Sequence, residues 1–496
     1  MALGLTTTAS ITKKTSVAFF IKEGKPQFGV KSKELSSLTQ KGLDQLVKLE
    51  AKGSSTATFL GEDSPSAVAQ IKAIPGLDES EEIRMAAYNL GLELKKQGLI
   101  KTVILVSDIS SSNFTAVVEG LLFAQYSFDT HKSAKSKALP IQWKVAISET
   151  AKKELTAVFK STSKIIAGVE TTRDLVNEPG GSLTPQIFVK RIQQTFKDDS
   201  RITLKVRNKA QLEKEGFNGL LTVGRGGINP PVMVTINYKP KKVSPAAKGT
   251  KLGLVGKGVT FDTGGISLKP PGTMWEMRMD MGGAGTVIGA MQAIADLDLP
   301  IPVVAVVCLT ENRPGVDAVL PGDIFTAKNG KTIQVENTDA EGRLILTDGL
   351  AEAGLQKATH IIDLATLTGA IIRAIGMSIT GLFSNNEELA DKITQAGAKS
   401  GEKFWRLPLD MEYRASLDDK VADMKNIGGD AGSITAGLFL QEFVPENTPW
   451  AHLDIAGTAF TTKPWKYYNW GATGWGVRSL VNLTEELARD KNSKNK

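Results

Sequence analysis

Four apolar runs in the last two thirds of the chain constrain its fold more than any other feature. Residues 251–255, 303–309, 361–365 and 452–455 have the composition of buried strands, and helical patterns lie between them at 285–297 and 344–353. Buried strands that alternate with helices form parallel sheets covered on both faces. We therefore expect an α/β domain with a mostly parallel central sheet flanked by helices.

The first third of the chain has an α/β pattern of its own. Strand candidates at 16–21, 57–60 and 102–107 alternate with helix-like stretches such as 79–97, where apolar residues recur at helical spacing. A helix-like segment at about 152–176 ends in the turn residues 177–181. Because 496 residues are too many for one ordinary domain, we expect two. These are a small α/β domain at 1–165, which lacks an acid cluster, and a larger domain at 166–496, which contains the polar segments described next.

Two polar segments carry the candidate chemistry. Residues 337–344 read Asn-Thr-Asp-Ala-Glu-Gly-Arg-Leu, and residues 255–283 contain Lys257, Asp262, Lys269 and Asp280. Three histidines are too few for an imidazole-rich metal site, so a metal would need oxygen ligands and perhaps an amine. With Asp339 and Glu341 the acids carry four charges, roughly what two divalent cations require. Such ligands suit Mg²⁺ and Mn²⁺, and Zn²⁺ also accepts carboxylate.

The two lysines differ in what they can contribute. An ammonium has no lone pair, so Lys257 can bind a metal only after losing its proton. At pH 7 this deprotonation costs about 4–5 kcal/mol, an amount that neighbouring dications can offset. Lys269 is better interpreted as a cation that polarises the scissile carbonyl and stabilises the tetrahedral oxyanion.

From about Arg173 to Leu480, these segments closely resemble the leucine aminopeptidase family, also called cytosol aminopeptidases. The resemblance implies that Asp262 and Glu341 bridge two metal ions, Mn²⁺ or Zn²⁺. Lys257 and Asp280 would complete one site, and Asp339 the other through its carboxylate and main-chain carbonyl. Arg343 would hold a bicarbonate that serves as general base. The implied enzyme is an aminopeptidase in which a water or hydroxide bound to the metals attacks the first peptide carbonyl.

A third family signature, Ala-Thr-Leu-Thr-Gly-Ala at 365–370, implies the substrate site. The main chain at Thr366, Leu367 and Gly369 is expected to hold the peptide near the metals. Met277 and Asn337 would line the site of the first residue, with Ala456 behind it, and an apolar pocket would favour leucine or methionine. The resemblance also implies a homohexamer. Ordinary packing is the alternative interpretation of these pocket residues.

Alternatives to this interpretation are structural, enzymatic and non-enzymatic. Asn337-Thr338-Asp339 is also typical of a helix N-cap, and the Gly-Lys-Gly and Thr-Gly-Gly runs are typical of tight turns. A two-metal phosphoesterase could use the same cations. Because some bacterial family members bind DNA, a DNA-binding or architectural role is the third alternative. The net charge of +7 is mixed along the chain, however, and only 491–496 form a notable basic cluster.

The remaining sequence features point to the cytoplasm. No stretch reaches the roughly 18 apolar residues of a membrane span, so we expect no membrane association. The lone Cys308 lies in an apolar run, which predicts a core thiol and fits a reducing compartment. The three histidines, His131, His360 and His452, are widely separated and are expected to pack or hydrogen-bond.

Overall fold

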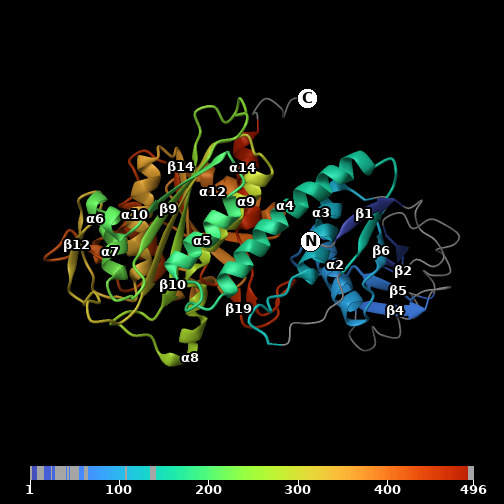
Figure 1. Ribbon diagram of the computed structural model, residues 1–496, viewed down its shortest axis with the longest axis horizontal. Helices are drawn as coiled ribbons and strands as arrows, with labels where there is room; N and C mark the ends of the chain where they lie inside the picture. The colour runs from blue at the N-terminus through green and yellow to red at the C-terminus, as the bar shows by residue number, and fades with distance from the viewer. Residues whose placement is uncertain are drawn as a thin grey trace. The chain divides into compact units, whose positions relative to one another are not determined.

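The computed structural model describes residues 3–7, 16–23, 25–27, 41, 44, 55–60, 65–106, 109–133 and 141–489. The chain divides into two compact units: Met1–Ile166 with Lys463–Asn469, and Ala167–Thr462 with Trp470–Lys496. Both are drawn in Figure 1. Ser107, at the end of one expected strand, and the basic cluster at 491–496 lie outside the described residues. Within the described chain, no helix combines the length and the apolarity needed to cross a membrane.

The first unit contains a sheet with strand order β1-β7-β6-β2-β5-β4, in which β4 is antiparallel to β5 and the other neighbours are parallel. Its strands are β1 (Gly4–Thr7), β2 (Ser16–Lys22), β3 (Lys25–Pro26, paired with β2), β4 (Thr56–Leu60), β5 (Pro65–Gln70), β6 (Thr102–Leu105) and β7 (Lys144–Ile147). Its helices are α2 (Glu79–Lys96), α3 (Ser111–Gln125) and the start of α4 (Lys152–Asn177). Each strand expected from the sequence in this part is present, as is the helix expected at 79–97.

The second unit contains a larger sheet with strand order β16-β15-β18-β14-β10-β11-β9-β8. The four central strands, β18 to β11, are parallel. On one side of them β9 is antiparallel to β11 and β8 is antiparallel to β9, and on the other side β15 is antiparallel to β18. The strands are β8 (Ile202–Arg207), β9 (Val232–Tyr238), β10 (Leu252–Asp262), β11 (Val303–Asn312), β14 (His360–Ala365), β15 (Ile379–Ser384), β16 (Lys403–Arg406) and β18 (Trp450–Asp454).

Helices cover both faces of this sheet, as the apolar strands require. In Figure 1, α6 (Lys209–Glu215), α7 (Asn218–Gly224) and α10 (Glu341–Leu355) lie on one side, and α5 (Pro185–Phe196), α9 (Gly282–Asp296) and α14 (Val477–Ala488) lie on the other. Shorter elements complete the unit: α8 (Pro271–Met274), the 3₁₀ helices η2 (Trp275–Met281) and η3 (Met411–Leu417), β12 (Ile324–Thr326), β13 (Thr332–Gln334), α11 (Gly369–Ile375), α12 (Glu387–Ser400), β17 (Met424–Lys425), α13 (Gly432–Gln441), β19 (Phe460–Thr461) and β20 (Gly471–Ala472).

Strand β10 is longer than its apolar run suggested, and this changes where two candidate site residues lie. The sequence placed Lys257 and Asp262 in a loop after the strand, but β10 continues through both and ends at Asp262. The tight-turn interpretation of Gly256–Gly258 is therefore wrong. These glycines instead allow close packing, since a Cβ at Gly256 would lie 2.6 Å from Ala284 Cα in α9. The turn comes later, where Gly264 and Gly265 have φ values of +86° and +65°.

The core between sheet and helices contains the residues expected there. Cys308 in β11 is fully buried. His452 is also fully buried, with its Nδ1 2.6 Å from Asp363 Oδ1, and its ring stacks on Phe383. His360 Nδ1 lies 3.1 Å from Thr359 Oγ1. Packing and local hydrogen bonding account for both histidines, as the sequence predicted.

Candidate metal centre and substrate loop

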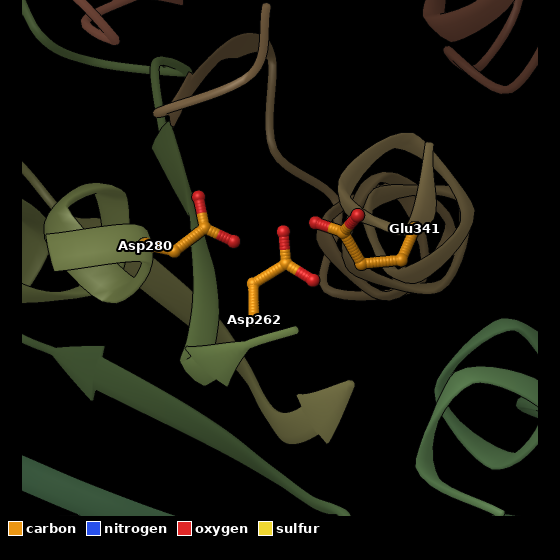
Figure 2. A group of neighbouring side chains, drawn as sticks. All are labelled: Asp262, Asp280 and Glu341. Carbon is orange, nitrogen blue, oxygen red and sulfur yellow. The ribbon is translucent and has the colours of Figure 1, made fainter. Parts of the chain in front are cut away.

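Three of the four expected acids converge beside the end of β10. Asp262 ends that strand, Asp280 lies in η2 and Glu341 is the first residue of α10. One carboxylate oxygen from each lies within 4.8 Å of the others, and all three side chains are buried. Figure 2 shows the carboxylates turned toward one another, with Asp262 between the other two. Residues up to 79 positions apart in the chain therefore meet in one acidic cluster.

The local backbone orients the side chains of Asp262 and Glu341 toward this cluster. The register between β10 and β11 shifts between Val259 and Asp262, and such irregularities redirect side chains at strand ends. Asp262 Oδ1 then accepts hydrogen bonds from Asn312 Nδ2 and Gly264 N, both at 2.8 Å. Glu341 stands in the first turn of α10, where a negative charge is favourable.

The N-cap interpretation of Asn337-Thr338-Asp339 is wrong. The N-cap of α10 is Ala340, and no side chain bonds to the helix N-terminus from that position. Asn337 Oδ1 instead accepts from Asp339 N at 2.8 Å and shapes the loop before the helix. This loop keeps the Asp339 carboxylate off the helix end and free for other partners.

Two lysines join the acids into one charged network. Lys257 Nζ lies 2.7 Å from Asp280 Oδ1 and 2.8 Å from Glu341 Oε1, and it also donates to Thr366 O at 2.8 Å. Lys269 Nζ lies 2.8 Å from Asp262 Oδ2 and 2.5 Å from Asp339 Oδ1. Each ammonium thus sits between two carboxylates, at positions where positive charge is strongly favoured.

Asp339 is set apart from the three clustered acids. Its side chain is 32% exposed, and it does not belong to the group whose oxygens lie within 4.8 Å of one another. Its link to the cluster is Lys269, which contacts both Asp339 and Asp262. The structure therefore places Asp339 beside the cluster, on its more open side.

Burial and mutual repulsion raise the pKa values of the acids. Burial, together with Glu341 and Asp262, raises the pKa of Asp280 well above its ordinary value although Lys257 opposes the shift. Burial also raises the pKa of Asp262 and of Asp339. Asp280 Oδ2 is buried and has no hydrogen-bond partner in the described part of the chain. Crowded carboxylates with raised pKa values and an unpaired oxygen fit a site for divalent cations.

The pKa values of the two lysines are raised as well, but here burial opposes the shift and the neighbouring acids cause it. Burial alone would lower the pKa of Lys257, but Asp280, Glu341 and Asp262 outweigh it and raise that pKa. For Lys269, burial is likewise outweighed by Asp262, Glu341 and Asp280, so its pKa is also raised. The surrounding carboxylates thus favour the ammonium form of both side chains.

Arg343 is buried two residues after Glu341. Its Nη1 donates to Asn426 O at 2.9 Å and its guanidinium lies over the Phe439 ring, while its Nε has no hydrogen-bond partner among the described residues. Burial lowers the pKa of Arg343 to about 10, and the carboxylates of Glu341 and Asp454 limit this shift. A buried guanidinium with an unused N–H donor is suited to bind an anion.

The expected substrate loop adjoins the acids. Thr366 Oγ1 donates to Asp280 Oδ1 at 2.8 Å, and Thr366 O is the acceptor of the Lys257 bond. Leu367 is half-buried and Gly369, at the start of α11, is exposed. Ala456 is buried and packs with Ile371 and Phe383. Met277 and Asn337 are half-buried. The structure thus joins Thr366 directly to the acids, whereas no hydrogen bond within the described chain does so for Met277.

Three buried polar residues that organise the site were missed from the sequence. Asn312 donates hydrogen bonds to Asp262 and to Thr338 O. Asn426 accepts from Glu336 N and Asn337 N and donates to Asn337 O and Ala340 O. Asp454 accepts hydrogen bonds from the 366–369 loop. Their partners lie 26 to 90 residues away. No local pattern marks them, since each lies at or just after the end of a strand and its partners are distant in the sequence.

Comparison with known proteins identifies similar sequences over most of the chain. The sequence model of the "Cytosol aminopeptidase family, catalytic domain" matches residues 170–481. A "Probable cytosol aminopeptidase" of Syntrophotalea carbinolica is 46% identical over 375 residues, which are 75% of this chain and 74% of that protein. Another, from Phytoplasma australiense, is 38% identical over 496 residues and covers 96% of this chain and 97% of its own length.

Solved structures with the same architecture include two enzymes. A mutant of tomato leucine aminopeptidase superimposes with a TM-score of 0.83 at 29% identity, covering 98% of this chain and 96% of that one. The bottromycin maturation enzyme BotP in complex with Mn superimposes with a TM-score of 0.81 at 30% identity, covering 96% of this chain and all of that one. The α/β fold expected from the sequence is therefore confirmed.

Proposed function

Because this chain belongs to the cytosol aminopeptidase family, and is thus a metal-dependent aminopeptidase, we propose that it uses two divalent cations held by the acidic cluster. The observation that carries this proposal is the convergence of Asp262, Asp280 and Glu341 within 4.8 Å, with Asp339 beside them. Neither the phosphoesterase nor the DNA-binding alternative is favoured by any feature of the described chain.

The ligands are assigned to the two cations as follows. Asp262 and Glu341 would hold both cations, Lys257 and Asp280 would complete one site, and the carboxylate and carbonyl of Asp339 would complete the other. The central place of Asp262 in Figure 2 supports its shared role. Lys257 must lose its proton to act as a ligand. Since its three acidic neighbours stabilise the ammonium, cation binding has to be coupled to release of that proton.

Bound divalent cations, Mn²⁺ or Zn²⁺ in this proposal, polarise a carbonyl oxygen and lower the pKa of water to near neutrality. Lys269 supplies the second positive charge at the reacting carbonyl. Asp262, Glu341 and Asp280 raise its pKa and so favour its ammonium form, and its side chain is partly exposed. An ammonium there stabilises negative charge developing on the carbonyl oxygen in the transition state.

Arg343 holds a bicarbonate in this proposal. Its guanidinium is buried and its Nε has no partner within the described chain, so an anion would find both charge and a donor. A bicarbonate bound there would supply a weak base of suitable strength for general-base catalysis. No described side chain near the acids offers a neutral imidazole for that task, since His452 is bonded to Asp363 in the core.

The substrate is a peptide with a free N-terminus. The main chain of Thr366, Leu367 and Gly369 holds it beside the acids, to which Thr366 is bonded. Met277 and Asn337 line the place of the first residue and Ala456 lies behind it. The apolar neighbours of Ala456, Ile371 and Phe383, support a preference for leucine-like residues.

The proposal extends to the assembly and location of the enzyme. It acts as a cytoplasmic homohexamer, in which the N-terminal domain at 1–165 provides subunit contacts and the domain at 166–496 provides catalysis. Sedimentation equilibrium tests the oligomeric state directly, and a monomeric enzyme with full activity would contradict this part.

Activity and cation content of the same samples test the proposal. We expect chelated protein to be inactive on leucine p-nitroanilide, and Mn²⁺ or Zn²⁺ to restore activity with two ions bound per chain. Lys269→Met should bind cations but lose at least about a hundred-fold in kcat. The matched control is Lys251→Met, a half-buried lysine before β10 that bonds Asn237 and Gln356. Activity without cations, a single ion at saturation, or faster hydrolysis of p-nitrophenyl phosphate would refute the proposal.

A further inference from the structure

Asp454 is a buried carboxylate at the end of β18 that has no assigned role in metal binding or catalysis. It is 1% exposed, and it lies opposite Ala365 in the parallel pair of β18 and β14. Ala365 is the last residue of β14, directly before the 366–369 loop. The register of the two strands therefore brings Asp454 to the base of the expected substrate loop.

The carboxylate of Asp454 accepts four hydrogen bonds. Its Oδ1 accepts from Leu367 N at 3.1 Å, from Thr368 N at 3.4 Å and from Ala456 N at 3.2 Å. Its Oδ2 accepts from Thr368 Oγ1 at 2.7 Å. An ionised carboxylate has about four acceptor positions and no donor, so it matches four converging donors in a way that an amide cannot. The Asp454 side chain thus links two segments of the proposed pocket, the 366–369 loop and Ala456.

The other end of the loop is held by the metal centre. Thr366 bonds Asp280 through its hydroxyl and Lys257 through its carbonyl. Thr368 is held in turn by Ser433 Oγ at 2.7 Å, and its own Oγ1 accepts from Ile371 N. Hydrogen bonds therefore fix the 366–369 loop at two places. Asp454 holds Leu367 and Thr368, and the metal centre holds Thr366.

This arrangement determines which main-chain groups the loop can offer to a peptide. Leu367 N and Thr368 N are both occupied by Asp454. By contrast, no residue of the described chain donates a hydrogen bond to the Leu367 carbonyl. The loop consequently presents a hydrogen-bond acceptor, which suits the amino and amide N–H groups of a peptide.

We propose that Asp454 is a positioning residue for substrate binding. By occupying the N–H groups of Leu367 and Thr368 and the Thr368 hydroxyl, it holds the loop in the conformation that leaves the Leu367 carbonyl as an acceptor for the peptide. The proposal rests on the aminopeptidase function above and assigns Asp454 to the binding step. The cations do not require Asp454, because none of their proposed ligands bonds to it.

Substitutions at both ends of the Asp454–Thr368 bond test this role. Asp454→Asn keeps the shape but replaces one acceptor by a donor, and Thr368→Val removes the hydroxyl at constant shape. Each should raise KM for leucine p-nitroanilide roughly 10- to 100-fold, as expected when a positioning contact is displaced, with a much smaller change in kcat. Thr368→Ser, which keeps the hydroxyl, should recover most of the loss. The double variant should lose less than the product of the single effects, because both changes break one contact.

Two readouts separate positioning from general damage. Calorimetric titration with L-leucine should show weakened binding, while the number of bound Mn²⁺ ions and their affinity stay unchanged. The matched control is Asp363→Asn, another fully buried carboxylate of this sheet, whose partners Trp450 and His452 belong to the core. This control should lower the melting temperature without moving KM.

Unchanged KM and L-leucine affinity in Asp454→Asn would overturn the proposal. So would loss of Mn²⁺ together with the KM change, fully multiplicative effects of the two single variants, or an equal KM increase in Asp363→Asn. If Asp454→Asn does not fold, the Thr368 variants alone decide through the same readouts. Failure of the aminopeptidase function itself would be distinguishable, because the unmodified chain would then not hydrolyse the peptide substrate at all.

Discussion

Gly342→Ala should damage the metal centre although it improves the helix. Gly342 is the second residue of α10, between Glu341 and Arg343. A Cβ built at this position would lie 2.7 Å from Lys257 Cε and 2.8 Å from Lys257 Nζ. Lys257 cannot simply swing away, since its ammonium is held by Asp280, Glu341 and Thr366 O. The added methyl group therefore competes directly with a proposed metal ligand.

The size of the effect follows from these contacts. Ordinary van der Waals contact begins near 3.4 Å, so Nζ at 2.8 Å must withdraw by about 0.6 Å. Such a shift strains three interactions with Lys257, two of them with carboxylates. Displacing even an outer-sphere partner typically lowers metal affinity about 10- to 100-fold, which corresponds to about 1.4–2.7 kcal/mol. In the opposite direction, Ala stabilises a helix interior by up to about 1 kcal/mol relative to Gly.

Activity measured against Mn²⁺ concentration distinguishes these opposed effects. We expect the variant to need at least about ten-fold more Mn²⁺ for half-maximal activity, with a melting temperature that falls little or even rises. The matched control is Gly272→Ala in α8, where an added Cβ meets nothing within 4 Å. A Gly342→Ala enzyme with unchanged Mn²⁺ dependence would refute the argument, because Lys257 would then tolerate displacement.

Three further predictions concern stability. Gly289→Ala should destabilise the second unit by about 1–3 kcal/mol or more, since its Cβ would lie 2.2 Å from Gly168 O where α9 packs on α4; a melting temperature equal to the parent's would contradict this. Asn426→Ala should cost at least about 2 kcal/mol in urea unfolding and weaken Mn²⁺ binding, because buried groups at Asn337 lose their partner; loss of neither would refute it. Burial raises the pKa of Asp348 to about 7, so the folded state binds the proton more tightly and stability falls as pH rises from about 4 to 7. Between pH 5 and pH 8 the parent should lose about 3 kcal/mol relative to Asp348→Asn, and parallel pH profiles would show that this carboxyl is not responsible.

The order of strands and helices was largely predictable from the sequence. The apolar runs at 303–309 and 361–365 became β11 and β14, and the helical pattern at 344–353 became part of α10. Strands that are buried on both faces of a sheet need continuous apolar runs, so the local sequence is enough to identify them. The ends of the elements were less predictable: β10 continues seven residues past its apolar run, because neighbouring β11 supplies hydrogen bonds where side-chain pattern gives no signal.

The candidate site was predictable in its residue types but not in its arrangement. The octapeptide and the Lys257–Asp280 region name the groups that could bind cations, and three of the four acids do converge. Asp339 stands apart, however, and the catalytic roles assigned to these residues remain predictions. Asn312, Asn426 and Asp454 were invisible in the sequence because the bonds that make them important join them to distant segments.

By itself the sequence determined the alternation of buried strands and helices, and it determined which side chains are available as ligands. Only the tertiary structure decided which of them meet. The order β18-β14-β10-β11 and its register bring Asp454 opposite Ala365 and Asp262 opposite Asn312. The physical reason is that periodicity and side-chain chemistry are local properties, whereas a hydrogen bond between segments 50 to 87 residues apart exists only once the sheet has fixed its strand order and register.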